Sequence, residues 1–255
     1  MGVVNVTPDS FSDGGVHLRV EAAVTSAWGM LEAGAALVDV GGESTRPGAA
    51  GVSVAEELER VEPVLADLQG APLSIDTSKA GVAQRALELG AELVNDVTAL
   101  RGDAELAGVV ADAGAYLCLM HMRGEPRTMQ DDPRYDDVVS EVAAFLEQRL
   151  AFAVAQGVPE ERICLDPGFG FGKTVEHNFE LIRRLDELVA LGRPLLVGLS
   201  RKRSLARLLG DAGATVASEA ASVGAAVAAL DRGATIFRVH DVRPHVEALT
   251  VAAAV

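Results

Sequence analysis

The sequence predicts a (β/α)₈ barrel, the TIM-type α/β fold, and three observations support this prediction. Eight short apolar runs rich in β-branched residues alternate with amphipathic stretches rich in Ala, Leu and Glu. Such alternation is typical of parallel strands joined by right-handed helical crossovers. The runs are apolar on both faces, which favours a closed barrel over an open doubly wound sheet. Because no low-complexity linker interrupts the series, we expect one domain spanning residues 1–255.

The elements follow one another in strand–helix pairs. We expect strands at residues 2–6, 36–40, 72–76, 91–97, 115–121, 162–166, 194–198 and 235–240. We expect helices at residues 19–33, 53–68, 78–89, 103–113, 136–156, 176–190, 201–209 with 215–232, and 242–253. Most of these carry apolar residues at i, i+3 and i+4. Gly-Ala steps at 34–35, 90–91, 114–115 and 233–234 are typical of left-handed helix C-caps that lead into a strand.

Composition excludes several classes of protein. A formal net charge of −15 argues against a nucleic-acid or anionic-membrane partner, because such partners require basic surface. The two cysteines, Cys118 and Cys164, lie inside apolar runs and are interpreted as buried, reduced thiols rather than a disulfide framework. The sequence contains no secretory signal and no apolar stretch of roughly 18 residues or more, so we expect a cytoplasmic protein.

Polar side chains follow nearly every predicted strand. In a barrel of this type the chemistry takes place at the carboxyl ends of the strands. A single Asp there is more often a helix cap, and Asp76 with Thr77 and Ser78 fits that interpretation. Helix capping is a poor explanation for polar or charged residues at the ends of seven of the eight strands. We therefore expect these groups to converge on a site. The residues at the strand ends are Asn5, Asp39, Asp76, Asn95, Asp96, His121, Asp166, Ser200, Arg201, Lys202, Arg238 and His240.

The glycine-rich stretch "DPGFGFGKT" at 166–174 resembles a phosphate-binding loop but does not match one. Pro167 stands where the first glycine of that motif belongs, and the dinucleotide fingerprint also fails. We interpret it as a shaped loop in which Asp166 anchors a ligand and Phe171 supplies a flat surface. The alternative is a structural turn with a core Phe.

Cations cluster in an otherwise acidic chain. Three successive cations in "GLSRKRSLARLLG" fall in the predicted first turn of a helix beginning near Ser200, where the helix dipole disfavours them. This placement indicates an anionic ligand, although a solvated basic face is the simpler alternative. Arg238 and His240 are two positions apart and share a strand face. The cations expected to converge are Arg46, Lys202, Arg203, Arg238 and His240.

In order along the chain, eight blocks together resemble the dihydropteroate synthases. The blocks are "NVTPDSFSDGG", "DVGGESTRPGA", "SIDTSKA", "NDVTAL", "LMHMRGEPRTMQ", "LDPGFGFGKT", "GLSRKR" and "RVHDV". The resemblance implies a (β/α)₈ barrel, usually dimeric. It also implies a Mg²⁺-dependent transferase of folate biosynthesis, which joins 6-hydroxymethyl-7,8-dihydropterin diphosphate to p-aminobenzoate and releases pyrophosphate.

The resemblance also implies a role for each matching residue. The pterin pocket would comprise Asp76, Asn95, Met120, Asp166, Phe171 and Lys202. The diphosphate would contact Asn5, Arg46, Arg238 and His240, with Asn5 also on the metal. The p-aminobenzoate site would comprise Ser10, Phe11, Thr45, Pro47 and Arg203, although Arg203 stands where some members have a small hydroxyl residue. The catalytic set would be Asp13, Asp76, Lys202, Arg238 and His240.

The polar loop at residues 5–15 then reads as a lid over the p-aminobenzoate site, with Gly14 and Gly15 as its hinge. Two alternatives remain at this point. One is a pterin-binding methyltransferase domain that serves a corrinoid protein, and the other is a non-catalytic pterin-binding paralogue. The small-residue helix at 215–232 is apolar on most sides, so it is either ordinary barrel packing or a homodimer interface.

Overall fold

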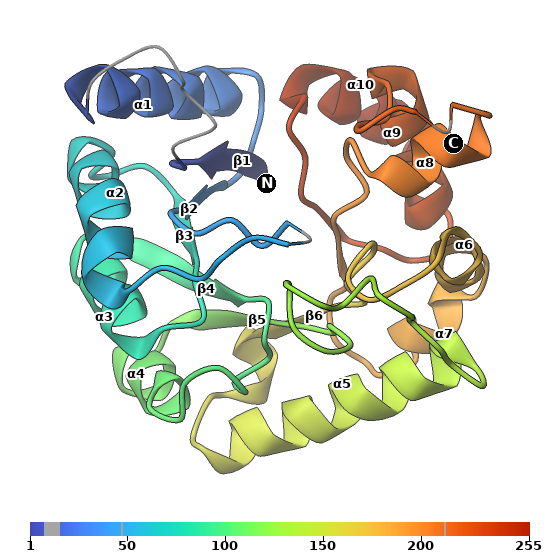
Figure 1. The fold of residues 1–255 in the computed structure, drawn as a ribbon. Helices are drawn as coiled ribbons and strands as arrows, with labels where there is room; N and C mark the ends of the chain where they lie inside the picture. The colour runs from blue at the N-terminus through green and yellow to red at the C-terminus, as the bar shows by residue number, and fades with distance from the viewer. Residues whose placement is uncertain (8–15, 47, 212) are drawn as a thin grey trace.

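Parallel strands surrounded by helices form the molecule (Figure 1). The computed structural model describes residues 1–7, 16–46, 48–211 and 213–255. Six strands form one parallel sheet in the order β1-β2-β3-β4-β5-β6, and β7 pairs in parallel with β8. The strands are β1 Gly2–Asn5, β2 Val38–Gly41, β3 Leu73–Asp76, β4 Ala91–Asp96, β5 Tyr116–Met120, β6 Ile163–Asp166, β7 Leu196–Val197 and β8 Ile236–Phe237.

Backbone contacts close these two sheets into a barrel. Leu165 forms a parallel bridge with Leu195, which joins β6 to the segment before β7. Gly2 forms a parallel bridge with Val239, and the Val3 amide donates to the Val239 carbonyl over 3.1 Å, which joins β1 to the segment after β8. The predicted eight-stranded closure is therefore confirmed, with β7 and β8 shorter than the sequence predicts.

The helices form the outer layer, one or two between successive strands (Figure 1). The helices are α1 Val16–Glu32, α2 Val54–Asp67, α3 Ala80–Glu88, α4 Leu106–Ala113, α5 Val138–Ala155, α6 Val175–Arg183, α7 Leu185–Val189, α8 Arg203–Leu208, α9 Glu219–Leu230 and α10 Val242–Ala252, with the 3₁₀ turn η2 Glu160–Arg162. The predicted helix at 176–190 is two helices that meet at Arg184. Among the described residues, none of the helices is both long and apolar enough to cross a membrane.

Strand alternation divides the apolar core into two layers. Outward-facing strand residues such as Val40, Ile75, Val94 and Leu117 belong to one large buried cluster shared with the helices. Inward-facing residues form a smaller cluster of Leu93, Cys118, Cys164 and Leu196. Both cysteines are buried and free, which confirms the interpretation of reduced thiols. One end of the barrel interior is thus filled by apolar side chains, and the polar residues on the same faces lie toward the carboxyl ends.

Candidate functional site

Strand register aligns the polar residues that face the barrel interior. Asn5 is level with Gly41, Gly41 with Asp76, and Asp76 with Asn95, while Met120 is level with Asp166. These positions are the last or next-to-last residues of their strands. The predicted convergence of Asn5, Asp76, Asn95 and Asp166 at one rim therefore agrees with the register.

Arg238, directly after β8, connects the inward-facing carboxylates. Its Nε donates to Asp39 Oδ2 over 2.6 Å and its Nη2 to Asp76 Oδ2 over 2.7 Å. Asp39 also accepts from Ser74 Oγ over 2.6 Å and from Asn95 Nδ2 over 3.1 Å. Asp39 is fully buried, and these donors occupy both of its oxygens. The network thus ties together four strands of the barrel, β2, β3, β4 and β8.

The two carboxylates share one guanidinium, and this affects their ionisation. Burial raises the pKa of the Asp76 carboxyl to about 7, the attraction of Arg238 opposes this rise, and the charge of Asp39 adds to it. Burial acts to lower the pKa of Arg238, but its two carboxylate partners raise that pKa above the ordinary value. Arg238 is therefore a permanent cation, whereas Asp76 can exchange a proton near neutral pH.

Asp166, at the end of β6, and Lys202, after β7, are buried groups that affect each other's ionisation. Burial raises the pKa of Asp166, while the Gly168 amide, which donates to Asp166 Oδ1 over 2.7 Å, and the nearby Lys202 oppose the rise. Burial lowers the pKa of Lys202 to about 8, against the attraction of Asp166. The Lys202 Nζ also lies 4.5 Å from the centroid of the Phe171 ring, a cation–π contact. Asp166, Lys202 and Phe171 thus form a cluster at the carboxyl end of the barrel in which both charged groups are buried.

The methionine predicted beside this pocket is buried with its neighbours. Met120 packs with Val97, Met122 and Met129, and half-buried Phe171 packs against this cluster. A polarizable, apolar surface of this kind suits one face of a flat aromatic ring.

The cationic stretch after β7 differs from the prediction. Its helix does not begin near Ser200: α8 begins at Arg203, because Arg201 has a φ of 60° that a right-handed helix excludes. Arg201 forms an ion pair with Asp241 over 2.5 Å. Only Lys202 of the three cations therefore reaches the buried carboxylates, and Arg203 is exposed.

His240 lies beside Ser200, with 3.1 Å between Nδ1 and the Ser200 Oγ. Burial, together with the charges of Arg201 and Arg238, lowers the pKa of His240 to about 4. His240 is therefore a neutral hydrogen-bonding group at pH 7 in this structure. Thr45 is half-buried and Arg46 is exposed in the loop after β2. Four predicted site residues, Ser10, Phe11, Asp13 and Pro47, lie outside the described residues.

Two strand-end residues do not face the interior. Both Asp96 oxygens are used within its own loop, by Thr98 and by the Leu100 amide over 2.6 Å. His121 packs edge-on against Phe145, with ring centroids 4.9 Å apart. Asp96 therefore stabilises its own loop and does not contribute to the site in the barrel interior. Asp76 caps no helix, since α3 begins at Ala80 and the Ala80 amide donates to Asp103.

The structure also contains an ion triad that sequence reasoning missed. Lys79 Nζ lies 2.5 Å from both Glu43 Oε2 and Glu57 Oε2. Glu43 belongs to the loop after β2, two residues before Thr45, and also accepts from the Val52 amide over 3.1 Å. The triad therefore fixes this loop to α2 and to the segment before α3. The blocks "GGESTRPGA" and "SIDTSKA" contain two of its members, but Glu57 lies in an ordinary amphipathic helix.

Gly168, in the loop between β6 and α6, has a backbone conformation and surroundings that exclude a side chain. Its φ is +69°, and a Cβ at this position would overlap the carbonyl oxygen of His121. We expect Gly168→Ala to lower the free energy of unfolding by about 3 kcal/mol or more, measured by urea denaturation. The matched control is Gly192→Ala, with a φ of +74° but no atom within 4 Å, for which about 1–2 kcal/mol is expected. Equal losses in the two variants would contradict the steric argument.

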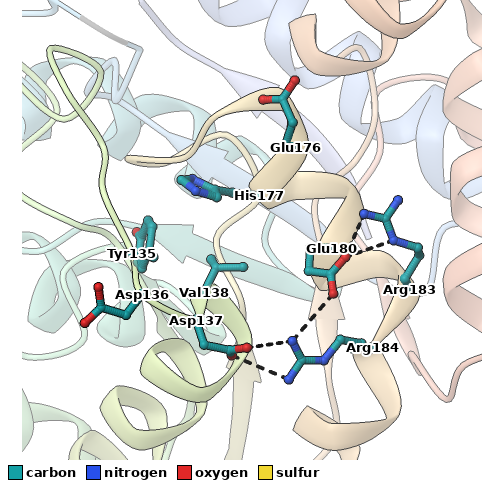
Figure 2. Close-up of a pocket in the computed structure, with 9 residues that line it drawn as sticks. All are labelled: Tyr135, Asp136, Asp137, Val138, Glu176, His177, Glu180, Arg183 and Arg184. Atoms are coloured by element: carbon teal, nitrogen blue, oxygen red, sulfur yellow. Dashed lines mark hydrogen bonds and ion pairs between the residues drawn. The ribbon is translucent and has the colours of Figure 1, made fainter.

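A surface hollow of about 270 Å³ lies outside the barrel, between the loop before α5 and helix α6 (Figure 2). Both of its arginines are paired: Arg184 with Asp137 over 2.8 Å, and Arg183 with Glu180 over 2.6 Å. This hollow therefore offers no unpaired cation for an anionic ligand, and the barrel interior remains the candidate site.

Comparison with known proteins gives a consistent result. The family described as "Pterin binding enzyme" matches residues 1–240. The dihydropteroate synthase of Neisseria meningitidis serogroup C is 50% identical over 256 residues, covering 98% of this chain and 89% of the relative. The Xanthomonas albilineans dihydropteroate synthase with 4-aminobenzoic acid superimposes with a TM-score of 0.91 at 49% identity, covering 100% of this chain and 91% of that one. A structure of the X. albilineans enzyme in complex with 7,8-dihydropteroate gives a TM-score of 0.87 at 45% identity, covering 100% and 92%.

Proposed function

This chain belongs to the dihydropteroate synthases, and from that premise we propose which of its residues bind each substrate and promote the reaction. The chain is a transferase of folate biosynthesis that condenses 6-hydroxymethyl-7,8-dihydropterin diphosphate with p-aminobenzoate. Neither alternative, a corrinoid-dependent methyltransferase domain nor a non-catalytic paralogue, has an observation in its favour. The observation that carries the assignment of residues is the inward-facing set of Asp76, Asn95, Asp166, Lys202 and Arg238.

The pterin ring binds against Asp166. A pterin presents an amino group and a ring N–H side by side, and a carboxylate accepts from both at once. The charge of Lys202 favours the ionised form of Asp166 against the effect of burial, and Lys202 encloses the ring together with Phe171 and Met120. Asn95 lies at the same level of the barrel as Asp76 and donates to Asp39, which orients its amide oxygen for the remaining pterin donors.

The diphosphate binds at the rim on the side of Arg238. Two ion pairs occupy the Arg238 Nε and Nη2, so Nη1 is the donor group that they leave for a phosphate oxygen. Exposed Arg46 adds positive charge. His240 begins as a neutral donor and gains its proton when a phosphate raises its lowered pKa. Preorganised contacts of this kind lower a barrier by roughly 3–4 kcal/mol each where measured.

Mg²⁺ fits this rim as an ion that the diphosphate carries with it. The described residues contain no group of three or more His, Cys, Asp or Glu side chains that could hold a metal without substrate. Mg²⁺ needs only one or two protein ligands when phosphate oxygens and water complete its octahedron. The half-buried Asn5 amide at the end of β1 is of the right donor type. The bound ion would neutralise charge on the departing diphosphate.

The reaction proceeds by loss of pyrophosphate before the new bond forms. The C–O bond to the diphosphate breaks, its electron pair leaves with pyrophosphate, and a pterin-methyl cation remains. Asp76 and Asp13 stabilise this cation, and the developing positive charge favours the ionised form of Asp76. The weakly nucleophilic amine of p-aminobenzoate then attacks the methyl carbon and loses a proton. The p-aminobenzoate contacts are Ser10, Phe11, Thr45, Pro47 and Arg203.

Pyrophosphate release tests the reaction directly. The assay follows pyrophosphate from the pterin diphosphate with Mg²⁺, with and without p-aminobenzoate. We expect one pyrophosphate for each dihydropteroate when all three are present, and sustained pyrophosphate release in the presence of p-aminobenzoate without dihydropteroate would contradict the condensation.

Phe11→Ala tests the lid assigned to residues 5–15. We expect it to raise the KM for p-aminobenzoate about tenfold, because an aromatic wall of the slot is lost, and to leave the Kd for the pterin diphosphate unchanged. Steady-state kinetics and calorimetry measure the two quantities. Phe152→Ala, at a half-exposed position on α5, serves as the control with neither constant altered. Equal losses for both substrates in Phe11→Ala would exclude the lid role.

We also propose that the enzyme is a homodimer that assembles at α8 and the segment after it. Leu208, Leu209 and Val216 are 62%, 67% and 56% exposed there, a large apolar area for a protein surface. Burial of this area against a second copy would remove the exposed leucines from water. Light scattering is expected to give twice the chain mass, and a Leu209→Asp variant the mass of a monomer.

A further inference from the structure

Side-chain donors bind the backbone carbonyls of the loop between β6 and α6. Lys173 Nζ donates to the carbonyls of Gly168 and Phe171 over 2.9 and 3.1 Å. Gln130 Nε2 donates to the Gly170 carbonyl over 2.5 Å, and the Tyr135 hydroxyl to the Gly172 carbonyl over 2.8 Å. Three glycines with positive φ give this loop its shape, so these donors fix a backbone that glycines alone would leave free.

Lys173 differs from the other two donors because it can carry a charge: burial lowers its pKa to about 7, so it is protonated mainly below that pH. It is 3% exposed, and its third contact is His121 Nδ1 at 2.9 Å. Burial lowers the pKa of His121 to about 2, so the ring is neutral and its Nδ1 accepts from the ammonium. No carboxylate contacts Lys173 directly among the described residues. Burying a lysine without such a contact disfavours its charged form, as the lowered pKa shows, and its three hydrogen bonds therefore indicate a role in the loop beyond packing.

The loop that Lys173 fixes carries one wall of the pterin pocket. Phe171 lies under the Lys202 ammonium, and the Gly168 amide donates to Asp166. A Cβ built on Gly170 would lie 3.4 Å from the Lys202 Cδ, so the loop backbone also limits where that lysine can lie. A change in the loop therefore moves Phe171, Lys202 and a donor to Asp166 together.

Lys173 also acts on Asp166 through its charge. The groups that face the Asp166 carboxyl are Lys202, Lys173 and Arg238, and all three lower its pKa against the effect of burial. Lys173 in turn faces Asp166, which favours its charged form, and Lys202, which disfavours it. Two lysines thus act on Asp166: Lys202, which is proposed to contact the pterin, and Lys173, which hydrogen-bonds to the loop instead.

We propose that Lys173 is a positioning residue for the pterin substrate, which fixes the β6–α6 loop by its carbonyl contacts and stabilises the Asp166 carboxylate from behind. This inference rests on the pterin pocket proposed above. Lys173 contacts neither substrate, so its effect is on pterin recognition through Asp166, Phe171 and Lys202. The residues proposed for the p-aminobenzoate site, Ser10, Phe11, Thr45, Pro47 and Arg203, all lie outside the β6–α6 loop, so we expect this site to be largely independent of Lys173.

Lys173→Met replaces the lysine with an uncharged side chain of similar length. It removes the charge and both hydrogen bonds to the loop carbonyls. We expect it to raise the KM for the pterin diphosphate about 10- to 100-fold and to change the KM for p-aminobenzoate less than threefold. The acid limb of kcat/KM for the pterin is expected to move up by about one pH unit, because Asp166 loses a cation that lowers its pKa. This limb is measured below pH 7, where Lys173 carries its proton in the wild-type enzyme.

Two further variants separate charge from loop structure. Lys173→Gln retains a donor for one carbonyl without the charge, so the same shift of the acid limb is expected with a smaller rise in KM. It also replaces Lys173→Met if that variant does not fold. Tyr135→Phe is the matched control, since it removes one carbonyl contact from the same loop without a change of charge. Its acid limb is expected to stay at the wild-type pH.

The result that would overturn the inference is an unmoved acid limb and an unchanged pterin KM in both folded Lys173 variants. Asp166→Asn distinguishes this outcome from a failure of the pocket itself. Loss of pterin binding in Asp166→Asn with wild-type behaviour of the Lys173 variants removes only the positioning role. An unchanged pterin Kd in Asp166→Asn removes the pocket assignment and the inference with it.

Discussion

Arg238→Met is expected to abolish turnover and to lower the free energy of unfolding by about 3–5 kcal/mol. The arginine is the cationic partner of both Asp39, which is fully buried, and Asp76. Its removal leaves two carboxylates close together in the barrel interior without a counter-charge. Urea denaturation gives the stability change, and pyrophosphate release gives the activity.

The matched control is Arg85→Met on α3. Arg85 also pairs with two carboxylates, Glu62 over 2.6 Å and Glu88 over 3.0 Å, but the three side chains are exposed to solvent. Exposed pairs contribute about 0–1 kcal/mol, so the Arg85 variant should stay close to wild type. Similar losses in both variants would show that burial of the carboxylates does not govern the effect.

The loss of stability in Arg238→Met should also depend on pH. The pKa of Asp76 is already raised to about 7 with the guanidinium present, and loss of that cation raises it further. A raised carboxyl pKa means that the folded state binds the proton more tightly than the unfolded chain. The variant should therefore be nearest to wild type in stability around pH 5, and its deficit should grow as the pH rises toward 8.

Asp166→Asn is expected to weaken pterin binding at least 100-fold, which corresponds to about 2.7 kcal/mol. The amide retains an oxygen for the Gly168 amide, and its NH₂ group then faces the pterin donors. Two groups that both donate leave buried hydrogen-bonding capacity unpaired, which costs more than the loss of one contact. Calorimetry with the pterin diphosphate measures the Kd.

Asp96→Asn is the control for this substitution. Asp96 is also a buried strand-end carboxylate, but Thr98 and Leu100 use its oxygens within its own loop. We expect it to lower the melting temperature and to leave the pterin Kd of the folded protein unchanged. A wild-type pterin Kd in Asp166→Asn, measured alongside this control, would contradict the proposed orientation of the ring.

Much of the architecture could be predicted because the relevant signals are local. The alternation of apolar strands and amphipathic helices depends on periodicity, and the barrel follows from their number and order. The ends of β7 and the start of α8 could not be predicted accurately from the sequence. Arg201 adopts a left-handed backbone conformation that is unusual for arginine and cannot be predicted from the residue type. Helix α8 therefore begins only at Arg203.

The polar rim was predicted in outline, and its internal pairing was not. Asp39 was recognised as a strand-end residue, but its partner Arg238 lies 199 positions later in the chain. The burial that lowers the pKa of His240 and the contacts that bury Lys173 likewise depend on packing between distant elements. Residue type and strand position identify candidates, whereas protonation state and orientation arise only when the barrel closes.

The shared guanidinium of Arg238 has a consequence for ionic strength. In the barrel interior the three carboxyl groups of Asp39, Asp76 and Asp166 face the three basic groups of Arg238, Lys202 and Lys173, so acidic and basic groups are equal in number there despite the net charge of −15 on the whole chain. A phosphorylated ligand must then find its counter-charge in an accompanying cation and in solvent-facing arginines such as Arg46. Added salt screens those outer groups and leaves enclosed ones nearly untouched. The enzyme should therefore still bind the pterin ring at salt concentrations that weaken its binding of the diphosphate group.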